Sequence, residues 1–212
     1  MKPPRRIPAV AVRRLPLYLR VLEDLAAEGV EVTSSADLAT RSGYSSEQIR
    51  KDLAYFGAFG TRGLGYDVAQ LTQHLRRILG LTAAVPVALV GAGNLGTALI
   101  RYASLGARDT YVAAVFDADP KKIGTEISGL RVRPMHELMT TLKDLGIRIA
   151  VIAVPEQNAR DVFDQLCAAE VKAVLNFAPA KLEKRQVSVQ NVDLTTELQS
   201  LAYFALGAGA DR

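Results

Sequence analysis

The sequence of 212 residues contains no tryptophan, one cysteine and two histidines, and these shortages exclude several classes of site. Cys167 alone cannot build a disulfide framework, and with His74 and His136 it supplies too few soft ligands for a structural zinc site, so no metal is expected. Arginines interrupt the apolar stretches near the N-terminus, which leaves neither a signal-peptide core nor a membrane span. We therefore expect a cytoplasmic protein with no membrane partner.

The net charge of +4 is small but unevenly distributed. Residues 1–82 contain 12 lysines and arginines against 8 acids, whereas residues 83–212 contain 14 of each. A basic N-terminal part indicates a polyanionic partner, although a solvated basic tail explains the same charge equally well. The sequence pattern has to decide between these two interpretations.

Two helices are predicted at the ends of residues 1–82. Apolar residues follow helical spacing over 16–28, where Pro16 suits the first turn and Gly29 the stop. The apolar residues of 67–79 also lie on one helical face, which predicts a connecting helix. These two helices frame a more informative segment.

A pair of short helices that meet across a glycine turn is predicted within residues 34–56. The first ends near Gly43, and the second opens with Ser45-Ser46-Glu47-Gln48, which has the spacing of a capping box. Ala39, Gly43 and Ile49 supply the small residue, the positive-φ residue and the buried anchor that a helix-turn-helix requires. This pattern is typical of DNA-binding proteins.

A glycine-rich segment follows the second helix. Residues 59–66 contain three glycines and an arginine, which indicates the tip of a β-hairpin, or wing. The order of helix, helix-turn-helix, wing and connecting helix predicts a winged-helix domain over residues 1–82.

Strand-like and helical patterns alternate from Val85 onwards. Short runs rich in β-branched residues are predicted as strands at 85–90, 110–116, 148–154, 172–176 and 187–192. Helices are predicted between them at 94–105, 135–145 and 157–170. This alternation predicts an α/β domain over 83–194, with a Rossmann-like, doubly wound parallel sheet. Residues 195–212 contain a final apolar helix that either covers this sheet or packs on another subunit.

The fingerprint Gly91-Ala92-Gly93-Asn94-Leu95-Gly96 follows the first of these strands and opens a helix. The three glycines suit a tight turn, close approach of a pyrophosphate, and close packing of helix on strand. Asp117 ends the next strand, where an acid binds the adenosine ribose and favours NAD over NADP. Lys121 and Lys122 weaken this preference, and Asp119 is a rival for the same role.

Residues for catalysis are scarce beside this fingerprint. His74 and His136 are expected in solvated or capping roles, and Cys167 as a small core residue. Too little chain remains after Pro179 to form a substrate domain. A cofactor site without chemistry, next to a DNA-binding module, indicates a sensor rather than an enzyme.

Longer motifs make the sequence recognisable. They are Gln48-Ile49-Arg50-Lys51-Asp52-Leu53-Ala54-Tyr55-Phe56-Gly57, Gly60-Thr61-Arg62-Gly63-Leu64-Gly65-Tyr66, Gly91 to Gly96, Leu175-Asn176-Phe177-Ala178-Pro179, and Val192-Asp193-Leu194. On these motifs the chain closely resembles the Rex family of redox-sensing transcriptional repressors, over essentially its whole length. The resemblance implies a homodimer that binds double-stranded operator DNA and leaves it when NADH rises relative to NAD+.

The resemblance also implies which residues contact DNA. Arg50 and Lys51 match the recognition helix in the major groove, and Arg62 matches the wing residue expected in the minor groove. Tyr55 is expected to pack in the core rather than to stack on bases. The complete expected set is Arg14, Ser46, Gln48, Arg50, Lys51, Tyr55, Arg62 and Gly63.

The second domain, by the same resemblance, binds NADH, and NAD+ more weakly. Apolar surroundings of Phe177 would favour the neutral nicotinamide ring of NADH, because a buried charge is costly. The expected contacts are Gly91, Ala92, Gly93, Asn94, Leu95, Gly96, Tyr102, Asp117, Val154, Pro155, Asn176 and Phe177.

Three residues match a contact that links the DNA-binding helices to the cofactor. These are Arg20, Tyr102 and Asp193, and we expect Arg20 and Asp193 to pair because a charge buried at either position needs a partner. The resemblance further implies that the C-terminal helix exchanges between subunits. Two alternatives stay open at this point: a small NAD-dependent oxidoreductase with a basic extension, and a domain that binds coenzyme A.

Overall fold

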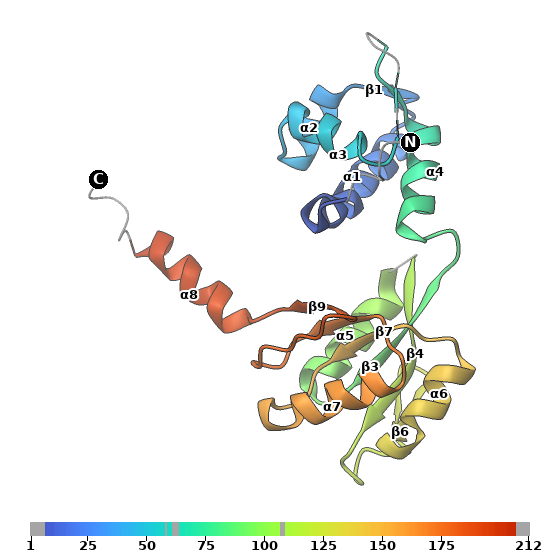
Figure 1. Ribbon diagram of the computed structural model, residues 1–212, viewed down its shortest axis with the longest axis vertical. Helices are drawn as coiled ribbons and strands as arrows, with labels where there is room; N and C mark the ends of the chain where they lie inside the picture. The colour runs from blue at the N-terminus through green and yellow to red at the C-terminus, as the bar shows by residue number, and fades with distance from the viewer. Residues whose placement is uncertain (1–6, 58, 61–63, 107–108, 207–212) are drawn as a thin grey trace. The chain divides into compact units, whose positions relative to one another are not determined.

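The computed structural model describes residues 7–57, 59–60, 64–106 and 109–206, without the side chains of 103–106. It forms two compact units, Met1–Ala83 and Ala84–Arg212, so the boundary falls one residue after the expected position (Figure 1). None of the helices within these ranges is both long enough and apolar enough to cross a membrane.

The first unit is a helical domain with a small sheet. Its elements are α1 (Ala9–Ala27), β1 (Val32–Thr33), α2 (Ser35–Ser42), α3 (Ser46–Leu53), β2 (Tyr66–Asp67) and α4 (Val68–Leu79). The apolar faces of the four helices enclose one core, in which Leu15, Leu22, Ile49 and Leu75 are fully buried. This core holds α2 and α3 against the two longer helices.

Helix α1 begins at Ala9, so the start predicted near Pro16 was wrong by about two turns. Pro16 lies inside the helix, where it has no backbone N–H to donate to the preceding turn. Ala11 and Leu15 are fully buried, and their packing keeps the turns before Pro16 helical despite this loss. The predicted stop is confirmed, because Gly29 follows the last turn with a φ of 79°.

Caps define the two helices of the helix-turn-helix. Ser34 and Asp37 form a reciprocal capping box at the start of α2. Gly43 ends α2 with a φ of 73°, a conformation that glycine adopts without strain. Ser45 caps α3 by accepting a hydrogen bond from the backbone N–H of Gln48, but the side chain of Gln48 turns inward instead of returning to the cap. The capping box predicted for α3 is therefore only half formed.

The segment predicted as the wing contributes one strand in its described part. This strand, β2, pairs antiparallel with β1, so that Tyr66 lies opposite Thr33. Gly65 has a φ of 91°, and a Cβ atom added there would collide with the carbonyl oxygen of Thr33. Glycine is required at this point because the two backbones approach so closely.

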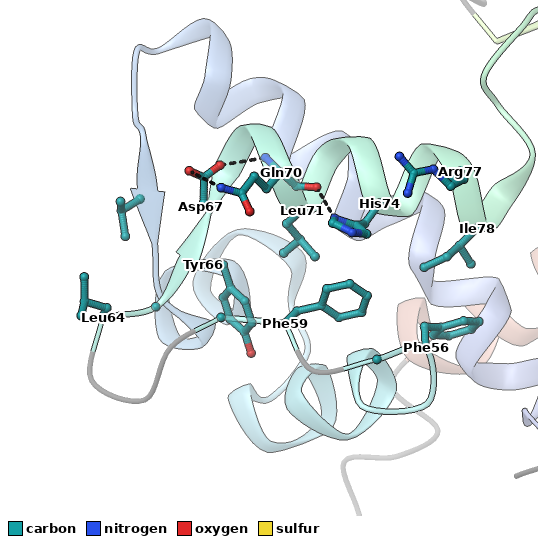
Figure 2. Close-up of a pocket in the computed structure, with 14 residues that line it drawn as sticks. Phe56, Phe59, Leu64, Tyr66, Asp67, Gln70, Leu71, His74, Arg77 and Ile78 are labelled. Atoms are coloured by element: carbon teal, nitrogen blue, oxygen red, sulfur yellow. Dashed lines mark hydrogen bonds between the residues drawn. The ribbon is translucent and has the colours of Figure 1, made fainter.

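A cavity of about 730 Å³ lies between the wing segment and α4 (Figure 2). Its lining includes Phe59 and Tyr66 from the segment and His74 from α4. The ring of His74 lies edge-on to Phe59, with 5.3 Å between the ring centroids, and its Nδ1 is 2.7 Å from the carbonyl oxygen of Gln70. His74 therefore packs at the base of the wing, a role that the sequence did not suggest.

In the described residues, the second unit is built on a seven-stranded sheet. Its strands are β3 (Val85–Val90), β4 (Thr110–Asp117), β5 (Glu126–Ile127), β6 (Leu130–Pro134), β7 (Ile149–Ile152), β8 (Ala173–Asn176) and β9 (Ser188–Asn191). They lie in the order β5-β6-β4-β3-β7-β8-β9, and β5 alone is antiparallel to its neighbour. Numbered along the chain, the six parallel strands have the order 3-2-1-4-5-6 of a dinucleotide-binding sheet.

The sequence did not predict β6, although this strand completes the classical order. Its residues alternate arginine with apolar side chains, and Val132 is its one buried residue. A strand that buries so little gives a weak apolar signal, and its place is decided by pairing with β4.

Helices cover both faces of the sheet (Figure 1). They are α5 (Asn94–Gly106), the 3-10 turn η1 (Met135–Glu137), α6 (Leu138–Asp144) and α7 (Glu156–Ala168). Leu89 of β3 packs with Ile100 of α5, whereas its neighbour Val90 packs with Phe163 of α7. Because successive residues of a strand point to opposite faces, one strand anchors both helical layers. The predicted fold class is confirmed.

The last helix, α8 (Leu194–Ala205), buries none of its side chains within the chain. Leu198, Leu201 and Phe204 are 67%, 60% and 74% exposed. Of the two roles considered for this helix, covering its own sheet is therefore excluded for the single chain. An exposed apolar helix of this kind indicates a protein partner.

Candidate functional site

Helix α3 has an inward and an outward face. Ile49 and Asp52 are buried, whereas Arg50 and Lys51, on the opposite side, are exposed. The guanidinium of Arg50 donates to the hydroxyl of Ser35, at the start of α2, over 2.7 Å. The outward face thus carries two cations, as expected of a helix that contacts phosphates and base edges.

Two of the expected DNA contacts turn away from this face. The guanidinium of Arg14 donates from Nε and Nη2 to the two carboxylate oxygens of Asp52, over 2.6 and 2.7 Å. The amide of Gln48 donates to the same carboxylate over 2.8 Å. Arg14 and Gln48 thus bind a buried acid of α3, because a buried carboxylate requires partners. Their contact with DNA stays a prediction.

The remaining expected DNA contacts are less constrained. Ser46 begins α3 and is half-buried, and Tyr55 is half-buried just after α3, which agrees with a packing role. Arg62 and Gly63 lie outside the described residues. Their contact with DNA stays a prediction.

The glycine fingerprint joins β3 to α5 beside the end of β7, at the point where the strand order reverses. Gly91 has a φ of 106°, and a Cβ atom added there would collide with the carbonyl oxygen of Ala153. A Cβ atom added at Gly96 would collide with the carbonyl oxygen of Gly91. These two glycines are required by packing, as the fingerprint predicts.

Gly93 differs from both, because a Cβ atom added there would meet no atom within 4 Å. Asn94 begins α5, and Asn94 and Leu95 are exposed. The first backbone N–H groups of a helix have no partner within the helix and attract anions. The open approach at Gly93 and these donors fit the pyrophosphate of a dinucleotide.

Asp117 ends β4 as a buried carboxylate that organises the loop around it. It accepts hydrogen bonds from the backbone N–H of Ala92 over 2.7 Å and of Asp119 over 2.8 Å, and its Oδ2 is 3.1 Å from Nζ of Lys122. Burial alone would raise the pKa of Asp117, but these donors outweigh it and hold the pKa below its usual value. Because a carboxylate offers about four acceptor positions, Asp117 retains capacity for a ribose hydroxyl.

The segments that follow β7 and β8 lie at the same edge of the sheet. The side chain of Val154 lies against Gly91, and exposed Pro155 follows it. Half-buried Phe177 follows β8, and its backbone N–H donates to the carbonyl oxygen of Ile152 over 2.9 Å. Ligands of such sheets bind outside the carboxyl ends of the strands, which is where these residues lie.

Asn176, expected as another cofactor contact, is completely buried. Its amide donates to the carbonyl oxygens of Ala178 and Ala180 over 3.1 and 2.7 Å and to Asn191 over 2.9 Å. Its own oxygen accepts from the backbone N–H of Ala178 over 3.0 Å. A buried amide must satisfy its polar atoms, and Asn176 does so by fixing residues 177–180. Its contact with the cofactor stays a prediction.

The three expected coupling residues are exposed in the single chain. Tyr102 is 77% exposed on α5, about 12 Å along the helix axis from Asn94, so the chain does not bring it to its own glycine loop. Arg20 is exposed on α1, and exposed Asp193 caps α8 by accepting from the backbone N–H of Thr195 over 2.9 Å. Neither charge is therefore buried in the single chain, and the pairing of Arg20 with Asp193 stays a prediction.

Comparison with known proteins finds relatives along almost the whole chain. The redox-sensing transcriptional repressor Rex of Natranaerobius thermophilus is 47% identical over 199 residues, which cover 93% of this chain and 91% of that protein. The chain belongs to the Rex family of redox-sensing transcriptional repressors. Rex of Streptomyces coelicolor is 46% identical over 200 residues, which cover 94% of this chain and 78% of that protein.

Solved structures of a Rex-family repressor, RSP, share the fold of both units. RSP in complex with β-NAD+ and operator DNA has a TM-score of 0.87 at 34% identity and covers 96% of this chain and 94% of its own. RSP in complex with β-NADH has a TM-score of 0.81 at 32% identity and covers 95% of both chains. The resemblance to Rex and the repressor function it implied are confirmed.

Two family models match separate parts of this Rex chain. "Putative DNA-binding protein N-terminus" matches residues 6–54, and "CoA binding domain" matches residues 82–180. Because Rex relatives align over 93% of the chain, both matched parts belong to one Rex protein. The second model describes a related sheet and does not by itself assign coenzyme A as the ligand.

Sequence reasoning missed the residues that organise each site. Asp52 holds Arg14 and Gln48, and Asn191 holds Asn176. One signal was available in the sequence: Asp52 lies three residues after the anchor Ile49, and therefore on the buried side of α3.

Proposed function

We propose that this Rex protein binds operator DNA as a homodimer and releases it when NADH binds, so that transcription follows the NADH/NAD+ ratio. One observation carries the proposal. A single chain joins a helix-turn-helix with outward cations to a 3-2-1-4-5-6 sheet whose glycine loop is open at Gly93. The first element suits a polyanion and the second a dinucleotide.

On the DNA side, Arg50 and Lys51 would enter the major groove, with Ser46 at the start of the same helix. Both cations are exposed and neighbour each other on α3. Arg62 and Gly63 are proposed as the wing contact in the minor groove. The support for this arrangement is the whole-chain similarity to RSP, which was solved with operator DNA.

On the cofactor side, the pyrophosphate would lie on the backbone of Ala92 to Leu95, and Asp117 would accept from the adenosine ribose. The nicotinamide would then face Val154, Pro155 and Phe177. Bound NADH supplies a neutral ring and NAD+ a charged one, and no hydride transfer is involved. An apolar wall at Phe177 favours the neutral ring, since burial of an unpaired charge is costly. The role proposed is regulatory rather than enzymatic.

The proposed dimer uses α8, whose leucines and phenylalanine need a protein surface to cover them. Arg20, Tyr102 and Asp193 are proposed to meet across the dimer, since all three are exposed in the single chain. In that arrangement Tyr102 would report the state of the partner's nicotinamide. Dimerisation and sensing would then share the same surfaces.

A DNA titration with competing ligands tests this function. A duplex is selected from a random library by the full chain, and its anisotropy is followed while NADH, NAD+, NADPH or coenzyme A is added. We expect NADH to release the duplex at a concentration about tenfold or more below that of NAD+. Coenzyme A should have no effect.

Three results would contradict the proposal. They are failure to select any duplex, release by coenzyme A but not by NADH, and equal potency of NADH and NAD+. Steady consumption of NADH with small carbonyl substrates, in the absence of DNA, would instead support the oxidoreductase alternative.

A further inference from the structure

The recognition helix carries a completely buried acid, Asp52, on the side opposite its two exposed cations. Its carboxylate accepts from both Nε and Nη2 of Arg14, from the hydroxyl of Tyr18 over 2.8 Å and from the amide of Gln48 over 2.8 Å. Four donors fill about all of the acceptor positions that a carboxylate has. The acid is therefore fully satisfied inside the first unit.

Aromatic rings close the cluster on its outer side. The guanidinium carbon of Arg14 lies 5.6 Å from the ring centroid of Tyr44. The ring of Tyr18 meets the ring of Tyr44 edge-on, with 5.8 Å between the centroids. The cluster thus joins three parts of the chain: α1 through Arg14 and Tyr18, the turn before α3 through Tyr44, and α3 itself through Asp52.

The directional character of these contacts matters for the orientation of α3. Ile49 and Leu53 anchor the helix by apolar packing, which tolerates small rotations about the helix axis. A bidentate arginine–carboxylate pair does not, because its two parallel hydrogen bonds hold only in one plane. Neighbouring residues of a helix are about 100° apart around its axis, so Arg50 and Lys51 project in fixed directions relative to Asp52. A small rotation of α3 about its axis would therefore change the direction in which Arg50 and Lys51 point.

We propose that Asp52 is a positioning residue that fixes the rotation of α3 through Arg14, and so determines which operator sequence is preferred rather than how strongly DNA in general is bound. This inference rests on the proposed DNA-binding function. The alternative is that Arg14 contacts a DNA phosphate directly, and such a contact would strengthen binding to every duplex equally.

The chain offers a matched control in the Arg41–Glu28 pair. Arg41 donates from both Nη atoms to the carboxylate of Glu28 over 2.7 and 2.8 Å, and this pair joins α2 to the end of α1 without touching α3. Asp52→Asn and Glu28→Gln therefore make the same chemical change, remove the same charge and break the same kind of pair. They differ in whether α3 is involved and in burial, since the side chain of Asp52 is fully buried whereas that of Glu28 is half exposed.

The experiment compares these two full-length variants on two duplexes at one salt concentration. One duplex is selected from a random library by the unmodified chain, and the other is a shuffled version of it. We expect Asp52→Asn to lose about tenfold or more in affinity for the selected duplex, while its affinity for the shuffled duplex changes no more than that of Glu28→Gln. Unchanged affinity of Asp52→Asn for the selected duplex, or equal losses on both duplexes, would overturn the proposal.

A second pair of variants separates positioning from direct contact. Arg14→Met should lose affinity for the selected duplex by a factor similar to that of Asp52→Asn. The double variant should bind that duplex no more weakly than the single variant with the larger loss, because both changes break the same pair. The dependence of binding on salt should stay as in the unmodified chain. A salt slope that falls by about one unit in Arg14→Met, with losses on both duplexes, would show that Arg14 contacts phosphate and would refute positioning.

Folding is controlled by thermal unfolding and by the fluorescence of bound NADH, which reports on the second unit. If Asp52→Asn does not fold, Tyr18→Phe decides, because it removes one donor and keeps the ring against Tyr44. We expect it to lose about threefold or more on the selected duplex alone, and no preferential loss would refute the proposal. If the unmodified chain selects no duplex, the DNA-binding function itself fails; if it does and these variants match it, only the positioning role fails.

Discussion

The three glycines of the fingerprint have different physical roles, although the pattern treats them alike. Gly91 and Gly96 are required because an added Cβ would collide with the backbone, at Ala153 and at Gly91 respectively. Gly93 borders open space instead. Within these six positions, two glycines are therefore required for packing and one leaves room for a ligand.

Alanine at these glycines should separate stability from binding. We expect Gly96→Ala to lower the free energy of unfolding by about 1–3 kcal/mol, because the helix must shift to admit the methyl group. Gly93→Ala should keep the parental melting temperature and bind NADH about tenfold or more weakly, which corresponds to ~1.4 kcal/mol. Calorimetric melting and an NADH fluorescence titration check both. A stable Gly96→Ala, or a Gly93→Ala that binds as the parent does, would contradict these roles.

Lys122 should control tolerance of the 2′-phosphate of NADPH. Its Nζ lies 3.1 Å from the predicted ribose acid Asp117 and partly offsets the charge that would repel a phosphate. We expect Lys122→Met to weaken NADPH binding by about fivefold or more and to change NADH binding much less. Isothermal calorimetry with both nucleotides measures this, and Lys121→Met is the matched control. An equal effect on both nucleotides would point to loss of loop structure.

The buried cluster in α3 should make stability depend on pH. Burial alone would raise the pKa of Asp52, but hydrogen bonds from Arg14, Tyr18 and Gln48 hold it below its usual value. A carboxylate whose pKa is lowered on folding stabilises the protein above its unfolded pKa of about 3.9 and loses that contribution as the pH falls further. We therefore expect the gap in melting temperature between the parent and Asp52→Asn to shrink from pH 6 to about pH 3. A gap that stays constant would show that the charge of Asp52 does not contribute.

At the scale of elements, α8 is a helix without a surface of its own. All its described side chains are exposed, and its leucines recur on one face. Its cap, by contrast, is complete within the chain, because Asp193 accepts from Thr195 and Thr196. The helix is therefore formed locally, and none of the described residues covers its apolar face.

A charge on the apolar face of α8 should prevent dimer formation. Leu201→Glu places a carboxylate where we expect an apolar contact with a second copy of the chain, and burial of that charge is costly. Light scattering should then report a monomer at concentrations where the parent is a dimer. Gln199→Glu adds the same charge to the same helix at a polar position and should leave the dimer intact. A dimeric Leu201→Glu variant would exclude α8 as the dimer contact.

At the scale of the whole molecule, the function depends on coupling between the two units. If NADH binds the DNA-free state more tightly, thermodynamic linkage requires operator DNA to weaken NADH binding by the same factor. We expect that factor to be about 5–150. It is measured by titrating operator DNA with and without NADH, and NADH with and without operator DNA. Asp193→Asn, which removes a charge but keeps an oxygen for the α8 cap, should reduce the factor equally in both directions. Different factors in the two directions would show that more than these two ligands are involved.

The features that could be predicted from the amino-acid sequence are local ones. Apolar spacing, the glycine turn at Gly43, the stop at Gly29 and the fingerprint before α5 act over a few residues, so they are visible without a fold. These signals sufficed for the winged helix and the doubly wound sheet, whereas the Rex resemblance rested on the longer motifs around Arg50, Arg62 and Phe177. They failed at Pro16, where burial of Ala11 and Leu15 extends α1 past a residue that locally disfavours it.

Which polar side chains are buried on internal partners depends on the assembled fold. Arg14 and Asp52 are 38 residues apart, and Asn176 and Asn191 are 15 apart, so no local spacing predicts either contact. In each case a buried polar group must find its partners inside the protein, because the cost of leaving it unpaired is of the same order as the stabilisation from a core contact. Arg14, Gln48 and Asn176 were therefore expected at ligands but lie on internal acceptors, since burial is a property of the assembled fold and not of the segment that carries the residue.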